Sequence, residues 1–161
     1  ILAMGKIRYL NRYATFGLAK MTGVAVLLIG TGTLAGIIAN SGLKDVIIQS
    51  VNALGLPSFA LAPISGILMS AATASTTSGT AVATSVFGPT IVGLGVTPLA
   101  TAAMIHVGAT VLDHLPHGSF FHATGGSVSM DMKERLKLIP YESLVGLTMT
   151  IVSTIIFGFI L

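Results

Sequence analysis

The sequence predicts an all-α integral membrane protein. Of its 161 residues, 53% are hydrophobic and only 8% are charged, whereas soluble domains carry about 25% charged residues. The stretch from Val46 to Leu112 contains no Asp, Glu, Lys or Arg. A water-soluble fold of this composition would expose apolar patches far larger than those on soluble monomers, which are on the order of a few hundred Å².

The N-terminal part is expected to contain one membrane-spanning helix. Residues 1–20 are basic and interleaved with tyrosines, a composition typical of the membrane–water interface. Residues 21–39 are an apolar run that is long enough to span hydrocarbon as a helix, and Asn40-Ser41-Gly42 ends it. Residues 44–54 place apolar side chains at helical spacing, which predicts an interfacial segment.

The middle of the chain is interpreted as a hairpin followed by a broken helix. Residues 57–95 contain two apolar runs around a polar tip at residues 75–80, which predicts a re-entrant hairpin that enters and leaves from the outer face. Residues 97–130 are then one broken transmembrane helix. The alternative of three full crossings requires residues 81–95 to span the bilayer, and that run is short for a crossing.

Residues 141–161 are the clearest predicted spanning helix, with Glu142 as its only charged residue. Basic residues precede both predicted spans: Lys6, Arg8, Arg12 and Lys20 before the first, and Lys133, Arg135 and Lys137 before the second. Because basic residues are enriched on the cytoplasmic side, both spans are expected to start there. Residues 131–137 are accordingly expected to form a solvated turn that faces lipid headgroups. The intervening chain must return an odd number of times, which favours one hairpin and one crossing.

The polar tip of the hairpin is the first candidate site. It is a run of hydroxyl and glycine residues: Ser75, Thr76, Thr77, Ser78 and Gly79. Hydroxyls and backbone N–H groups at the start of a helix can bind a carboxylate, so these residues are predicted to bind substrate. Small hydroxyl residues also serve helix packing, but an uninterrupted run exceeds what packing needs.

The predicted helix break is the second candidate site. Asp113, His114 and His117 are ionisable residues beside apolar runs, and such residues at membrane depth are costly to bury and commonly functional. Because histidine exchanges protons near neutral pH, these three are predicted to couple proton movement. Gly118 and Ser119 are predicted to complete the substrate site. The competing interpretation is a wet external loop.

The remaining features argue against other classes of protein. His106 is expected to be a packing residue and His122 an interfacial one. The spacing of Asp113, His114, His117 and His122 matches no zinc motif, so no metal or other cofactor is predicted. The chain has no cysteine and shows no nucleophile–base pair, phosphate loop or paired carboxylates, so no enzyme is predicted. The basic residues that give the net charge of +3 flank the predicted spans. This arrangement indicates membrane orientation and predicts no nucleic-acid partner.

Four landmarks, in their order and spacing, resemble the gluconate permease (GntP) family of the ion-transporter superfamily. They are Gly30-Thr31-Gly32-Thr33, Asn40-Ser41-Gly42, Ser70–Gly79 and Asp113–Phe121. The resemblance runs from about Val24 to Leu161 and corresponds to the C-terminal half of such a permease. Gluconate permeases show a string like Ser-His-Val-Asn-Asp-Pro-Gly-Phe where this chain reads Asp113-His114-Leu115-Pro116-His117-Gly118-Ser119-Phe120, so the acid stands in a different place here.

The resemblance implies half of an inverted-repeat secondary transporter, in which a re-entrant hairpin and a broken helix meet near the midplane. It implies a multi-pass protein of the inner (plasma) membrane that imports gluconate-like or other small organic carboxylates with protons. Its partners would be the lipid bilayer, the N-terminal half of the same permease, and further copies in a homo-oligomer. Two alternatives stay open: a non-transporting membrane scaffold or accessory subunit, and a cation/proton antiporter of the same superfamily.

Overall fold

The computed structural model describes residues 7–160, apart from the side chains of some residues between 20 and 39, and contains no strand in that range. The predictions that involve Lys6, the Lys20 side chain and Leu161 concern parts of the chain that the structure does not describe. Short helical turns are η1 (Ile7–Tyr9) and η2 (Ser58–Ala60), and a π-helical turn, η3 (Ile156–Ile160), ends the described chain. The α-helices are α1 (Leu10–Asn40), α2 (Leu43–Ala53), α3 (Leu61–Thr73), α4 (Thr76–Gly93), α5 (Pro98–Gly108), α6 (Ser119–Ser127) and α7 (Met132–Ile155).

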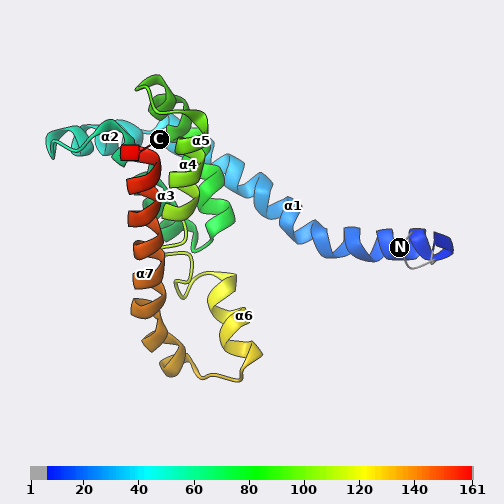
Figure 1. The fold of residues 1–161 in the computed structure, drawn as a ribbon. Coiled ribbons are helices and arrows are strands. Elements are labelled where there is room, and N and C mark those ends of the chain that lie inside the picture. The colour runs from blue at the N-terminus through cyan, green and yellow to red at the C-terminus, as the bar shows by residue number, and fades with distance from the viewer. Residues whose placement is uncertain (1–6, 161) are drawn as a thin grey trace.

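The first helix projects away from the other helices, and only its C-terminal end meets them (Figure 1). α1 runs through both the predicted interfacial residues and the predicted span at 21–39 without a break. No proline interrupts this run, and a single internal glycine such as Gly17 weakens a helix without ending it. Near the far end, Ile38 is buried against the core.

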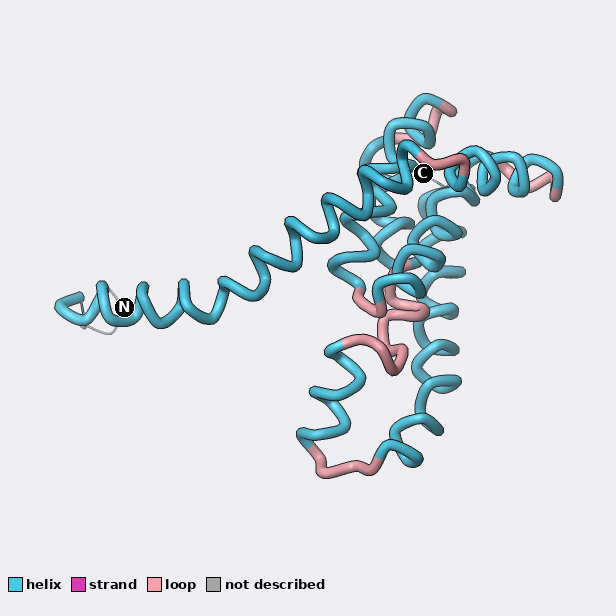
Figure 2. Tube along the Cα trace, turned by 180° about the vertical axis from the view of Figure 1, so that it is seen from behind, coloured by secondary structure: helices cyan, strands magenta, loops and turns pink. Residues whose placement is uncertain are grey.

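The second helix lies across the direction of α7 in both views (Figures 1 and 2). Val51 is buried in the core, whereas Val46 and Leu54 are exposed. A helix with apolar side chains on its solvent side suits the membrane surface. The interfacial location of residues 44–54 stays a prediction, since only the helix itself is seen.

The predicted hairpin corresponds to α3 and α4, but its non-helical tip is shorter than residues 75–80. Only Ala74 and Ser75 lie between the two helices. Ala74 adopts the left-handed conformation with φ 44°, and Ser75 caps α4 by accepting a hydrogen bond from the Ser78 N–H at 3.3 Å. Because serine is a strong N-cap residue, the following hydroxyl residues form the first turns of a helix instead of a loop.

Two turns of the same design follow α2 and α4. In each, a glycine with positive φ comes two residues after the last helical residue: Gly55 (66°) and Gly95 (95°). The residue after each glycine donates its N–H to a carbonyl five residues earlier, which is the Schellman arrangement. Pro57 and Pro98 then precede or begin the next helical segment. Residues 57–59, which follow the first turn, and residues 94–97, which contain the second glycine, line one pocket, so these two segments lie together.

The core lies between α3, α4 and α5, whose backbones approach closely. Leu61, Phe87 and Met104 are among its fully buried residues. A Cβ atom on Gly108 would lie 2.5 Å from the Pro63 carbonyl oxygen, a distance that real Cβ atoms do not reach. Such glycine-mediated contact is typical of helices that pack within a membrane.

The last helix, together with η3, meets the length and hydropathy expected of a membrane span. This segment, Met132–Ile160, has 29 residues, and among the described residues no other helix meets both criteria. The solvated turn expected at residues 131–137 is wrong, because most of that segment is the beginning of α7. Asp131 and Glu134 form a capping box, with Asp131 Oδ1 accepting the Glu134 N–H at 2.7 Å. This cap starts the helix before the apolar run does.

Small residues join α7 to α5. Gly146, Thr150 and Ser153 are buried on α7, and a Cβ atom on Gly146 would lie 2.7 Å from the Thr110 carbonyl oxygen. Thr150 Oγ1 donates to the Val107 carbonyl at 3.2 Å. The C-terminal half of α7 therefore runs beside α5, while α6 lies beside its N-terminal half (Figures 1 and 2).

Candidate functional site

The hairpin tip and the helix break are in direct contact. The break covers residues 109–118, between α5 and α6, and begins earlier than the predicted residues 113–119. Gly118, the last residue of the break, packs against Ala74 in the hairpin tip. A Cβ atom on Gly118 would lie 2.3 Å from the Ala74 carbonyl oxygen, so a side chain at this position would force the two segments apart. The two sites predicted separately from the sequence are therefore adjacent.

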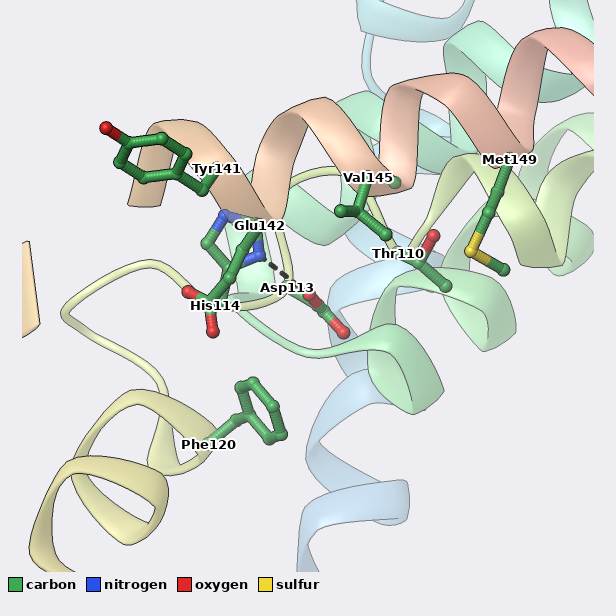
Figure 3. A pocket seen from close by; sticks show the side chains of 9 residues that line it. Thr110, Asp113, His114, Phe120, Tyr141, Glu142, Val145 and Met149 are labelled. Carbon is green, nitrogen blue, oxygen red and sulfur yellow. Dashed lines mark hydrogen bonds and ion pairs between the residues drawn. The ribbon is translucent and has the colours of Figure 1, made fainter. Parts of the chain in front are cut away.

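A chain of hydrogen bonds, here called the relay, joins the hairpin, the break and α7. Thr76 Oγ1 in the first turn of α4 donates to Asp113 Oδ2. The other carboxylate oxygen, Asp113 Oδ1, lies 3.1 Å from His114 Nδ1 (Figure 3). On the far side of the ring, His114 Nε2 lies 2.9 Å from Ser143 Oγ and 3.2 Å from the Ile139 carbonyl oxygen. Three elements thus meet through one histidine and one carboxylate.

The partners of His114 allow two neutral forms and one charged form of its ring. A neutral ring with its hydrogen on Nδ1 donates to Asp113 Oδ1 and accepts at Nε2 from the Ser143 hydroxyl, whereas a neutral ring with its hydrogen on Nε2 donates to the Ile139 carbonyl or to Ser143. Only a ring with hydrogens on both nitrogens donates to Asp113 and to the Ile139 carbonyl at the same time.

Burial makes this contact consequential. The His114 side chain is 2% exposed and the Asp113 side chain 18% exposed. Hydrogen bonds and ionic contacts are stronger in such a poorly hydrated environment than in water, and unpaired polar groups there are costly. Asp113 nonetheless keeps some access to the surface.

A pocket of about 320 Å³ opens beside the relay (Figure 3). Its wall consists of residues from the break, from α6 and from α7: Thr110, Asp113, His114, Phe120, Tyr141, Glu142, Val145, Gly146 and Met149. We refer to it as the α7 pocket. Its size is within the usual range for small-molecule sites, about 300–1,000 Å³. Most of the wall is apolar, and its two acids, Asp113 and Glu142, come from different elements.

The predicted substrate residues have unlike environments. Ser75 is the helix cap described above, and Gly79 packs against the backbone of Ser70, with an added Cβ only 2.7 Å from Ser70 Cα. Ser78 is buried, and its hydroxyl has no hydrogen-bond partner among the described residues. None of these three lines the α7 pocket.

Three further predicted residues are exposed: Thr77 on α4, His117 in the break and Ser119 at the start of α6. Of the three residues predicted to couple protons, the structure joins Asp113 and His114 to each other and leaves His117 outside the relay. The roles of all these residues stay predictions, because geometry alone shows position and contact.

The other histidines make isolated contacts. His106 is exposed on α5 and lies 3.3 Å from Thr80 Oγ1 through Nδ1, so it is not the enclosed packing residue that its apolar neighbours suggested. His122 stacks edge-on against Phe121, with ring centroids 5.3 Å apart. Across the described part of the chain, no three His, Asp or Glu side chains gather as metal ligands.

Sequence reasoning missed three residues on α7. Ser143 contacts His114, and Glu142 lines the α7 pocket. Arg135, predicted only as a cytoplasmic charge, is buried and paired with Glu142 at 2.6 Å. The spacing of Arg135 and Glu142, seven residues apart, places both on one face of a helix and was a readable signal. No signal in the sequence marked Ser143.

Comparison with known proteins gives one close relative. A curated protein of Haemophilus influenzae, named an uncharacterized transporter, is 73% identical to this chain over 155 residues. The match covers 96% of the chain but 37% of that protein, so the chain spans little more than a third of the relative's length. No family model and no solved structure matches the chain. The relative's name and the helical fold both agree with a membrane protein and support a role in transport.

Proposed function

We propose that this chain forms the hairpin and broken-helix part of a secondary transporter, in which proton binding at Asp113 and His114 is coupled to uptake of a small organic carboxylate. The observation that carries the proposal is the relay. It connects the hairpin tip, the helix break and α7 through one carboxylate and one histidine. The close relative's name supports transport; the substrate class and the coupling ion rest on the chemistry of the chain.

Proton coupling follows from the way in which the relay holds the hairpin. With both ring nitrogens protonated, His114 donates to Asp113 and to α7 at the same time, and Asp113 accepts from Thr76, so the hairpin tip is attached to α7. With one fewer proton, His114 donates on one side only, and this attachment weakens. A transporter needs a difference in interaction between two states for a ligand to shift their populations, and one proton provides such a difference here.

The carboxylate is assigned to the meeting point of α4 and α6. The N-caps of both helices lie at the contact between the hairpin tip and the break: Ser75 is next to Ala74, and Gly118 packs on Ala74. Helix N-termini favour anions through their free N–H groups and their dipole. The unpartnered Ser78 hydroxyl adds a donor in the same turn. In the α7 pocket itself, the Asp113 carboxylate would repel an anion and Glu142 is already paired with Arg135, so the carboxylate binds at the helix caps.

The proposal includes the setting that the family resemblance implies. The chain would work in the inner membrane, with the N-terminal half of the same permease supplying the other side of the site, and in a homo-oligomer. The length of the relative, of which this chain covers 37%, leaves room for such a half.

Uptake by right-side-out vesicles tests the proposal. Vesicles containing the full-length protein would be given labelled gluconate and a panel of three- to six-carbon carboxylates, with and without an imposed inward pH gradient. We expect one carboxylate to accumulate only with the gradient, and accumulation to be lost in Asp113→Asn and His114→Ala. His122→Ala, a histidine outside the relay, is the matched control. Unchanged uptake in both relay variants would show that the coupling assignment is wrong.

A cation/proton antiporter is the second candidate, because the α7 pocket has two carboxylates and no basic residue other than His114 in its wall. When the relay loses its proton, a cation near Asp113 would replace the lost charge. The two candidates differ in which ligand stabilises the folded protein. A rise in melting temperature with sodium but with no carboxylate supports the antiporter, and a rise with neither supports the scaffold alternative.

A further inference from the structure

A buried arginine near the start of α7 contacts both α6 and Glu142, a residue of the α7 pocket wall. Arg135 is 2% exposed, although it belongs to a group of basic residues whose other members, Lys133 and Lys137, are exposed. Its Nη1 donates to Glu142 Oε2 at 2.6 Å, and its Nε donates to the Phe121 carbonyl oxygen at 3.3 Å. An arginine buried so completely requires partners, because removing one partner leaves an uncompensated charge.

The contacts with α6 are made by the whole guanidinium group and its stem. The guanidinium carbon lies 4.8 Å from the centre of the Phe121 ring, a cation–π distance. Gly125, one turn further along α6, packs on the methylene groups of Arg135, which an added Cβ would approach to 3.4 Å. Carbonyl, ring and glycine together match the planar, forked shape of arginine better than they would match lysine.

α6 has little else to hold it. It stands apart from the hairpin and α5, between the break and the turn at residues 128–131 (Figures 1 and 2). Phe120, which precedes the Phe121 that Arg135 contacts, forms the α6 side of the pocket wall (Figure 3). Because Arg135 holds Phe121 in place, it also determines the position of this wall.

The same guanidinium also fixes a residue on the opposite wall. Glu142 lines the α7 pocket with 32% of its side chain exposed, and its carboxylate is held by Arg135. One buried cation thus sets the places of an aromatic wall on α6 and an acid on α7. The remaining nitrogen, Nη2, is buried without a partner among the described residues.

We propose that Arg135 is a positioning residue that sets the width of the α7 pocket by holding α6 and Glu142 in register. It acts through Phe121 and Glu142 and does not line the pocket itself. As a statement about transport, this inference rests on the proposed function; as a statement about geometry, it does not.

The geometric part is tested by the distance between α6 and α7. The chain has no cysteine, so spin labels at Ala123→Cys and Leu144→Cys, both exposed positions, report this distance in the full-length protein once any other cysteine is replaced. We expect Arg135→Met to lengthen or broaden the distance distribution, and Arg135→Lys to do so partially. Lys133→Met removes an exposed charge from the same turn and should leave it unchanged.

A variant that preserves the arginine separates the positioning role of Arg135 from simple misfolding. Glu142→Gln keeps the shape of the ion-pair partner and leaves the Phe121 contacts, so it should fold and broaden the distribution less than Arg135→Met. Distributions equal to the unmodified protein in both Arg135→Met and Glu142→Gln would overturn the inference. So would an equal change in Lys133→Met.

Transport supplies the second readout. With whichever carboxylate is accumulated, Arg135→Lys should raise KM severalfold while uptake still depends on the pH gradient, because the relay is untouched. A role in folding alone would lower the maximal rate with KM unchanged, and that result counts against the inference. If no carboxylate is accumulated by the unmodified protein, the proposed function fails, whereas the distance measurement still decides whether Arg135 holds α6.

Discussion

Replacing Thr76 by valine removes the hydrogen bond between the hairpin and Asp113 and changes almost nothing else. Valine has nearly the shape of threonine, so the Cβ branch and the helix start are kept. The lost bond has a carboxylate acceptor, and such bonds contribute about 1.5–3 kcal/mol. Because Asp113 keeps 18% exposure and regains some water, the lower end applies, which corresponds to a factor of about ten in an equilibrium constant.

Thr84→Val is the control for this change. It makes the same substitution about two turns along the same helix, at an exposed position, where surface substitutions usually change stability by less than about 0.5 kcal/mol. We expect gradient-driven uptake to fall by about tenfold in Thr76→Val and to stay near normal in Thr84→Val, at equal amounts of protein in the membrane. Equal uptake in the two variants would refute the connection of the hairpin to the relay.

Further predictions use the same logic of matched changes. Gly118→Ala should destabilise the protein by about 1–3 kcal/mol through overpacking. Its control, Gly126→Ala, has nothing within 4 Å of the added Cβ and should be neutral or slightly stabilising. Thermal unfolding in detergent compares the two variants, and similar unfolding midpoints would contradict the contact at the hairpin tip. Ser143→Ala should reduce gradient-driven uptake less than His114→Ala does, because the histidine keeps its backbone carbonyl partner; a larger loss in Ser143→Ala would be inconsistent with the relay. Gly108→Ala should lower the unfolding midpoint relative to Gly126→Ala, since its Cβ would meet a carbonyl of α3 at 2.5 Å.

The helices were largely predictable because apolar runs and turn residues mark them. The hairpin arms at α3 and α4 follow from two apolar runs around hydroxyl residues, and the break follows from Pro116 and Gly118. The ends of elements were less predictable. The predicted tip covers residues 75–80, but a single N-cap, Ser75, starts the next helix there. The capping box at Asp131 starts α7 several residues before its apolar run begins.

The site was predictable in its parts and not in its assembly. Hydroxyl residues and ionisable residues in an apolar chain are visible in the sequence, so Thr76, Asp113 and His114 were identified. Which of them meet depends on how α4, the break and α7 are rotated against one another, and packing decides that rotation. For this reason the sequence offered no means to separate His114 from His117, or to find Ser143.

The level of the relay along α7 has an electrical consequence. Ser143 stands near the beginning of the predicted span at residues 141–161, and Ile160 lies 17 positions further along the chain, or about 26 Å of helix. If the basic end of α7 faces the cytoplasm, a proton that reaches Asp113 from outside has already crossed most of the membrane field. Moving a charge through the full field changes its energy by about 2.3 kcal/mol per 100 mV, so the membrane voltage itself would help to load the relay from outside.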